Sequence, residues 1–310
     1  MPQNPGPHRT DNTYRGRFAP SPTGPLHFGS LLAALASFLD ARHNKGQWYV
    51  RIEDLDPPRE QAGAADTILR TLEAFELYWD GSIVWQSQRH QLYEDICQQL
   101  LSENKAYYCT CSRSQLAQLG GVYPGTCRDS LGSTSANPPG TPHAIRLRTT
   151  TNPVLVKDRI QASFRQNVAR AVGDFVIKRK DGLYAYQLAV VVDDQAQQIS
   201  HVVRGTDLFD NTPRQMLLQQ SLGFEPPEYA HLPVVVNSQG QKLSKQTFAP
   251  ALATNNPTPI LLQALTVLGY RLSDDILEAR TEDVLAWAIE HWSINNVPKQ
   301  SAVQNPEHKD

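Results

Sequence analysis

The 310-residue chain has no long run of apolar residues and almost no excess of charge. Its longest apolar segment, residues 31–39, is much shorter than the roughly 20 residues that a membrane-spanning helix needs. The first residues are polar and Pro-rich, and no apolar stretch follows a basic cluster, so they do not have the pattern of a signal peptide. These absences argue against an integral membrane protein and predict a globular protein in the cytoplasm.

The small net charge of −2 argues against tight binding of nucleic acid through bulk phosphate contacts, because proteins that bind this way are usually basic. A local basic patch still fits an RNA partner. Four cysteines are too few and too clustered for a disulfide scaffold. Three of them, Cys109, Cys111 and Cys127, lie close together in the sequence, which favours metal binding over redox chemistry.

Hydrophobic periodicity predicts an α/β architecture. Residues 15–19 and 48–52 have the pattern of strands, and residues 26–43 have apolar residues at the spacing of a helix. Together they form a βαβ unit, for which a parallel sheet is the natural arrangement. Asp193 and Asp194 would end a later strand and are expected to cap the turn after it; contact with a substrate nucleotide is the alternative. The same reasoning predicts helices over 60–79, 88–103, 214–222, 259–268 and 282–291, and strands over 174–177, 185–194 and 232–236.

Two short polar motifs suggest a site for ATP. In the first, a Pro/Gly turn leads into a helix, with His27 in its first turn and Gly29 leaving room for a nucleotide. The N-terminus of a helix attracts phosphate, and a His there can stabilise charge as pyrophosphate leaves. In the second, Lys242 and Lys245 flank a serine in a loop after a strand. Each motif alone is also typical of an ordinary surface turn, whereas the pair is more specific.

The two motifs together resemble the signatures of class I aminoacyl-tRNA synthetases. The sequences RFAPSPTG at 17–24, RIEDLD at 51–56 and HVVRG at 201–205 are similar to the glutamyl branch, and the resemblance covers residues 15–250. Ser30 and Gln246 depart from the usual residues but keep a small or polar side chain. The resemblance implies a Rossmann-like class I synthetase catalytic core, with His27 and Lys245 as catalytic residues and an ATP site of His27, Gly29, Ser30, Lys242 and Lys245.

The segment after the second motif narrows the resemblance. A glutamyl-tRNA synthetase continues with a helical anticodon-binding domain, whereas only residues 246–310 follow here. In this respect the chain is similar to the glutamyl-Q tRNA(Asp) synthetases. That resemblance implies that it activates L-glutamate with MgATP to glutamyl-adenylate and transfers the glutamate to the queuosine base in the anticodon of tRNA(Asp). The alternatives are a minimal synthetase that charges tRNA(Glu), a non-catalytic tRNA-binding paralogue, and a nucleotidyltransferase on a similar fold.

A glutamate pocket follows from chemistry and from the resemblance. The two carboxylates of glutamate need cations, and Arg17 and Arg204 can bind them in a bidentate manner. Glu53 can hold the ammonium group, and Tyr186 can supply a hydrogen bond and a wall. A lone Arg is more often in a surface ion pair, and Tyr186 also fits a half-buried core position. By resemblance, the glutamate-binding positions are Arg17, Phe18, Ala19, Pro20, Ser21, Glu53, Tyr186 and Arg204.

Between residues 107 and 145, Cys, Gly, Pro and Ser replace the helical pattern, and residues 129–140 look like a flexible loop. This composition predicts a small insertion stabilised by one structural zinc ion, with thiolates as ligands. By resemblance the fourth ligand is a tyrosine, so the expected set is Cys109, Cys111, Tyr123 and Cys127. His143 is the conventional chemical alternative for the fourth ligand, and three buried thiols without metal is the other interpretation.

These features divide the chain into segments. The sequence has no heptad pattern or apolar stripe that would indicate a partner chain, so a monomer is expected. The expected segments are a disordered tail (1–13), the first half of the catalytic domain (14–106), the zinc-binding insertion (107–145), the second half of the catalytic domain (146–250), a helical C-terminal segment (251–300) and a polar tail (301–310).

Overall fold

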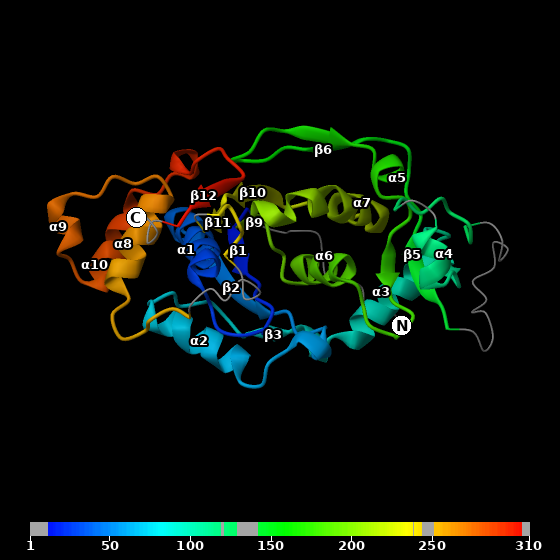
Figure 1. The fold of residues 1–310 in the computed structure, drawn as a ribbon, viewed down its shortest axis with the longest axis horizontal. Helices are drawn as coiled ribbons and strands as arrows, with labels where there is room; N and C mark the ends of the chain where they lie inside the picture. The colour runs from blue at the N-terminus through cyan, green and yellow to red at the C-terminus, as the bar shows by residue number, and fades with distance from the viewer. Residues whose placement is uncertain (1–11, 119–120, 129–141, 238, 244–250, 306–310) are drawn as a thin grey trace.

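The computed structural model describes residues 12–118, 121–128, 142–237, 239–243 and 251–305 (Figure 1). Among these residues, no helix has both the length and the apolar composition that a membrane crossing requires. Three sequence predictions lie wholly or mostly outside the described ranges: the disordered tail over residues 1–13, of which only 12 and 13 are described, the flexible loop over 129–140, and the role of Lys245.

The first part of the chain has the predicted βαβ order. Strand β1 (Arg15–Phe18) pairs in parallel with β2 (Gln47–Ile52), and helix α1 (Phe28–His43) connects them. The short strand β3 (Val84–Trp85) extends the sheet beyond β2. Most of α1 is buried, since the helix packs against its own sheet and also against α8 (Thr258–Val267), where the C-terminal segment covers it.

A second parallel pair lies next to the first. Strand β9 (His201–Gly205) pairs in parallel with β10 (Glu228–Leu232), and α7 (Thr212–Leu222) lies between them in the chain. Strand β9 also packs against β1 and α1. The two parallel pairs therefore bring the chain around residues 15–20 next to the chain around residues 201–205.

The predicted strand over residues 185–194 is wrong, because this segment is helix α6 (Tyr186–Ala196). Every residue from Gln187 to Asp194 is buried. A short, continuously apolar run has no polar side to reveal its period, so the pattern of a buried strand and that of a buried helix are the same. Asp193 and Asp194 consequently lie inside a helix and cap no turn after a strand.

The segment around the cysteines forms a different kind of sheet. Strands β4 (Ala106–Cys109), β5 (Ala144–Leu147) and β8 (Val176–Lys178) are antiparallel. Figure 1 shows β5 and the short helix α4 (Arg113–Ala117) at one end of the elongated molecule, and the C-terminal helices at the other. The insertion is thus separated from the parallel sheet by the length of α6 and α7.

The C-terminal segment is helical, as predicted, with α8, α9 (Asp274–Leu277) and α10 (Thr281–Glu290). The polar tail predicted from residue 301 needs correction, because Ala302–Gln304 form strand β12, which pairs in parallel with β11 (Val234–Val236). A strand of three residues is too short to show an alternating pattern in the sequence. Its pairing satisfies backbone groups along one edge of β11.

The remaining elements are short or are peripheral to the cavity. Helices α2 and α3 confirm the helices predicted over 60–79 and 88–103, with closer limits. These elements are α2 (Ala64–Ala74), α3 (His90–Ser102), β6 (Val154–Val156), β7 (Phe164–Gln166), α5 (Val168–Ala171) and the short 3₁₀ turns η1 (Pro57–Arg59), η2 (Gln86–Gln88), η3 (Thr206–Asn211) and η5 (Ile294–Asn296).

Candidate active site

One cavity of about 590 Å³ lies at the carboxyl ends of β1, β2 and β9. In open parallel sheets this is the edge at which ligands bind. All described residues that the sequence assigns to glutamate or ATP line this cavity, although they come from segments far apart in the chain. These residues are Arg17, Phe18, Ala19, Pro20, Ser21, His27, Gly29, Ser30, Glu53, Tyr186, Arg204 and Lys242.

The start of α1 forms one wall. His27 is the residue that caps the helix: its Nδ1 accepts from the backbone N–H of Ser30 at 3.3 Å, and the Ser30 hydroxyl oxygen accepts from the backbone N–H of His27 at 2.8 Å. Because Nδ1 accepts, the proton of the neutral ring is on Nε2. A Cβ at Gly29 would lie 3.2 Å from the imidazole of His27, so glycine leaves the ring in its place.

Lys242 also lines the cavity. The backbone of Lys242 forms an isolated β-bridge with Val236 of β11. The ammonium group of Lys242 forms an ion pair with Asp207 at 2.6 Å. Both side chains are partly exposed. The cation is therefore held at the rim of the cavity, beside the capped start of α1.

A buried ionic network supports the floor of the cavity. Arg51 is completely buried, and its guanidinium contacts Asp194 at 2.8 Å and Glu53 at 3.2 Å. Arg17 contacts the same carboxylate of Asp194 at 3.2 Å. Burial opposes the charge of Asp194, but the two arginines lower its pKa. Asp194 thus stays ionised and bridges the two guanidinium groups.

Asp193 extends the same network to three further side chains. Its carboxylate accepts from the Tyr93 hydroxyl at 2.7 Å, from the Gln86 amide at 2.7 Å and from Arg89 at 2.6 Å. Sequence reasoning missed the roles of Arg51, Asp193 and Asp194. A charged residue at position 51, in an otherwise apolar strand, is the signal that points to a buried partner.

Arg204 is held by two hydrogen bonds and keeps donor capacity for a ligand. Its Nε donates to His231 Nε2 at 3.1 Å, and one terminal nitrogen donates to the Thr212 hydroxyl at 2.9 Å. The other terminal nitrogen is buried and has no hydrogen-bond partner among the described residues. Since Arg204 is only 5% exposed and lines the cavity, this nitrogen is a donor that an anionic ligand can satisfy.

Glu53 and Tyr186 complete the pocket with one anion and one phenol. Burial raises the pKa of Glu53, although Arg51 and Arg17 act in the opposite direction. A bound ammonium group would favour its charged form and offset that burial. Burial also raises the pKa of Tyr186, so its hydroxyl remains protonated and can donate. Tyr186 is the first residue of α6, so the predicted position at a strand end is wrong for this residue.

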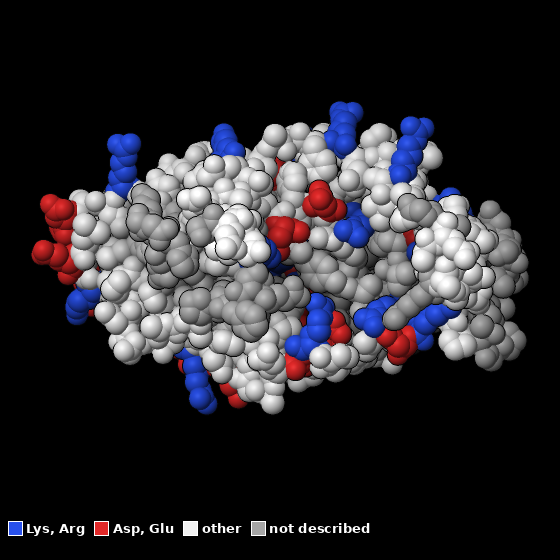
Figure 2. Space-filling view, in the orientation of Figure 1, with Lys and Arg blue, Asp and Glu red and all other residues white. Residues whose placement is uncertain are grey.

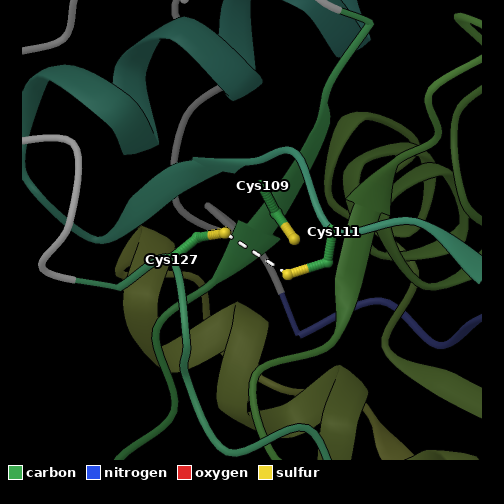
Figure 3. Close-up of side chains that lie close together, drawn as sticks. All are labelled: Cys109, Cys111 and Cys127. Atoms are coloured by element: carbon green, nitrogen blue, oxygen red, sulfur yellow. Dashed lines mark hydrogen bonds between the residues drawn. The ribbon is translucent and has the colours of Figure 1, made fainter. Parts of the chain in front are cut away.

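The three predicted cysteine ligands do come together. The Sγ atoms of Cys109, Cys111 and Cys127 lie within 4.8 Å of one another, all three residues are buried, and their side chains point toward one another (Figure 3). The Tyr123 hydroxyl lies 3.5 Å from Cys109 Sγ and 3.6 Å from Cys111 Sγ. Three sulfurs and a phenol oxygen at this spacing are a donor set that can hold a metal ion.

The surroundings of this cluster favour thiolate at one position. Burial opposes the charge of Cys127, yet hydrogen bonds from the Tyr123 hydroxyl and from the backbone lower its pKa to about 7. The Arg146 guanidinium lies 3.8 Å above the ring of Tyr123. His143, the alternative ligand, is outside the group of clustered ligand atoms and packs its ring against Tyr108. Among the described residues, the fourth donor beside the thiols is therefore Tyr123.

Charged side chains are mixed over the face shown in Figure 2. Acidic residues gather at the end formed by α9 and α10, and the described residues of this face present no continuous basic patch. This distribution fits the net charge of −2.

Comparison with known proteins identifies the family. Residues 13–275 match the model of the catalytic domain of class I tRNA synthetases (E and Q). The chain is 50% identical to the glutamyl-Q tRNA(Asp) synthetase of Pseudomonas entomophila (strain L48) over 293 residues, which cover 94% of this chain and 97% of the relative. This chain belongs to the glutamyl-Q tRNA(Asp) synthetase family. A family member from Pectobacterium atrosepticum is also 50% identical, over 94% of this chain and 88% of its own.

Solved structures agree with this assignment to the glutamyl-Q tRNA(Asp) synthetase family. A glutamate tRNA ligase from Elizabethkingia meningosepticum, determined in complex with its amino acid, superposes with a TM-score of 0.80 at 25% identity. The match covers 95% of this chain and 67% of that structure. The glutamate-tRNA synthetase of Elizabethkingia anophelis gives a TM-score of 0.79. The fold is thus that of a class I synthetase catalytic domain.

Proposed function

We propose that this chain activates L-glutamate with MgATP to glutamyl-adenylate and transfers the glutamate to the queuosine base in the anticodon of tRNA(Asp). The observation that carries the proposal is that one cavity unites a capped helix start, two arginines and a carboxylate from segments far apart in the chain. Relatives that it matches over nearly their full length are named for this reaction. The names of these relatives support queuosine as the acceptor, since no described residue that lines the cavity points to a particular nucleoside.

In this proposal glutamate lies between Arg17, Arg204 and Glu53. The unpartnered guanidinium nitrogen of Arg204 donates to one carboxylate, Arg17 contacts the other, and Glu53 receives the ammonium group. This arrangement balances each charge of the amino acid with an opposite charge. Phe18 to Ser21 and Tyr186 form the walls of the pocket.

ATP lies against the start of α1, next to the glutamate. The protonated Nε2 of His27 faces the phosphates, and Gly29 and Ser30 keep that wall compact. Lys242 at the rim, together with Lys245, absorbs charge on the leaving pyrophosphate. The α-carboxylate of glutamate attacks the α-phosphorus, and no protein nucleophile is required. Catalysis then consists of positioning and charge stabilisation.

The tRNA hydroxyl attacks the carbonyl carbon of the adenylate and AMP leaves. In the proposed reaction this hydroxyl belongs to the queuosine base. The enzyme acts as a monomer in the cytoplasm.

Cys109, Cys111, Cys127 and Tyr123 would hold one zinc ion. The donor set fits zinc, because three sulfurs and one phenol oxygen provide the four ligands of a structural site. The ion would stabilise the insertion over residues 107–145 and take no part in the reaction.

Transfer of labelled glutamate tests the function. Purified protein is incubated with ATP and with tRNA(Asp) that contains or lacks queuosine, and with tRNA(Glu) as a third substrate. Label on queuosine-containing tRNA(Asp) alone is the expected result. Label on tRNA(Glu) would make the protein a minimal glutamyl-tRNA synthetase, and no label on any tRNA would favour a binding paralogue.

A further inference from the structure

A buried histidine lies behind Arg204, outside the set of residues assigned to substrates. His231 on β10 is opposite Arg204 on β9 in the parallel register, and it is 0% exposed. Its Nδ1 lies 2.5 Å from a carboxylate oxygen of Asp158, whose side chain is also 0% exposed. Its Nε2 lies 3.1 Å from Arg204 Nε. The three side chains therefore form a line that ends at the cavity.

The hydrogen bonds determine the tautomer of His231. A guanidinium N–H can only donate, so His231 Nε2 must accept from Arg204. The proton of the neutral ring is then on Nδ1, where it is donated to Asp158. Asp158 also accepts from the backbone N–H groups of Ile160 and Gln161 at 3.0 and 2.8 Å. These hydrogen bonds hold the Asp158 carboxylate in place, and the carboxylate in turn fixes the orientation of the His231 ring.

Thr212 closes the arrangement from a third element. Its hydroxyl oxygen accepts from Arg204 at 2.9 Å and lies 3.2 Å from His231 Nε2. Two of the three guanidinium nitrogens of Arg204 are thus held by protein groups. The third has no partner among the described residues, although Arg204 lines the substrate cavity.

We propose that neutral His231, held by Asp158, is the positioning residue that orients Arg204 toward the glutamate carboxylate, and that protonation of His231 weakens glutamate binding. The inference rests on the proposed function, in which Arg204 binds glutamate. A protonated ring has N–H on both nitrogens and can no longer accept from Arg204. It also places a second cation directly beside the guanidinium in a buried site, so Arg204 must leave its position.

The charges around His231 favour the neutral ring at pH 7. The titratable groups that act on it are Asp158 from the segment between β6 and β7, Arg204 from β9 and Asp207 from η3. The ring of Tyr229, also on β10, stacks on it. Burial lowers the pKa of His231, and Arg204 lowers it further, whereas the two carboxylates act in the opposite direction. The net result is that the pKa of His231 lies below its ordinary value. His231 is therefore neutral and holds Arg204 at neutral pH, and it loses this role when it is protonated in acid.

Calorimetric titration of glutamate into the full chain between pH 5.5 and 8 tests this proposal. His231→Gln keeps an acceptor for Arg204 but cannot titrate, whereas His231→Leu removes the acceptor. His201→Gln, on the neighbouring strand, is the matched control because His201 does not line the cavity. ATP is titrated into each variant as well, since a merely structural defect would weaken both ligands.

The wild type is expected to lose glutamate affinity as the pH falls through the lowered pKa of His231, which lies below the ordinary value of about 6.5 for histidine. His231→Gln should bind at pH 7.5 like the wild type and should not lose affinity in acid. His231→Leu should bind glutamate roughly 10- to 100-fold more weakly at every pH, as expected for one lost hydrogen bond to a charged group. ATP affinity should stay unchanged in all variants, and His201→Gln should keep the wild-type profile.

An acid loss that persists in His231→Gln would overturn the proposal, as would wild-type affinity in His231→Leu. If His231→Leu does not fold, the pH profile of His231→Gln decides the question alone. Wild-type protein that binds no glutamate at any pH is a different result, because it refutes the proposed function and, with it, the role of His231 in positioning Arg204.

Discussion

The substrate cavity and the cysteine cluster bury polar groups by different means. Under the cavity, the buried charges of Arg17, Arg51, Glu53 and Asp194 lie next to opposite charges, and large apolar clusters surround them. The cysteine cluster has almost no apolar core of its own; its buried residues are Tyr107, Cys109, Cys111, Tyr123 and Cys127, with Leu116 packed against them. The fold itself can therefore hold the cavity in shape, whereas the proposed zinc ion would stabilise the cluster.

Removal of the metal should have the largest effect and should separate the two regions. Cys109→Ala is expected to lose the zinc and to expose residues 107–145 to protease, because structural zinc sites contribute on the order of 10 kcal/mol. Glutamate affinity should persist, since the cavity has its own support. Metal content by mass spectrometry and limited proteolysis measure both effects. Cys97→Ala, which removes a buried thiol on α3, is the control and should keep the zinc. A metal-free wild type that resists protease would instead favour three core thiols.

Removal of one charge from the network under the cavity should have the next largest effect. Asp194→Leu leaves Arg51 and Arg17 without their shared carboxylate, so we expect it to lower the free energy of unfolding by about 3 to 5 kcal/mol. Asp194→Asn keeps an acceptor and should cost less. Urea unfolding gives the values, with the exposed Asp181→Asn as the control. An equally stable Asp194→Leu protein would contradict the view that charge balance holds this region.

Arg204→Ala should affect binding more than folding. We expect glutamate affinity to fall roughly 100-fold, which corresponds to about 2.7 kcal/mol, because the variant loses a charge-assisted contact with the substrate. ATP affinity should change little. Arg165→Ala, at an exposed position of β7, is the matched control. Equal losses for both ligands would place Arg204 among the purely structural residues.

The pH dependence of stability should show the smallest effect. The pKa of His231 is lowered by burial, so the unfolded chain binds a proton more readily and stability falls as the pH drops below 6.5. The pKa of Asp158 is lowered too: burial opposes its charge, but the hydrogen bond from His231 prevails, so a second loss follows below 3.8. Urea midpoints between pH 5 and 7.5 should show the first step in the wild type and not in His231→Gln. Identical curves would exclude His231 as its source.

The order of elements and the cavity residues could be predicted where the sequence pattern is local. A Pro/Gly turn between a strand and a mostly apolar helix identifies β1 and α1, and strand ends identify Arg17, Glu53 and Arg204 as neighbours. The three cysteines were also recognisable, because their spacing is short. In each case the signal lies within a few residues or in a motif.

The supporting residues could not be predicted because their partners are distant. Asp158 and His231 are 73 residues apart, and Arg51 and Asp194 are 143 residues apart. No pattern within one segment shows such a pair. For Asp194 the error had a second cause, because the apolar run before it concealed the helical period of α6. The segment was therefore predicted as a strand, and Asp194 as the cap of the turn after it, whereas it is a buried carboxylate that bridges two arginines.

The pairing of β11 with β12 has a consequence for synthesis on the ribosome. Strand β11 immediately precedes the loop that carries Lys242, yet its neighbour β12 is translated only after residues 237–301 have been added. Strand β11 cannot pair with β12 before residues 302–304 have been added, so the backbone pairing on this side of the cavity depends on a segment that is translated much later than the Lys242 loop.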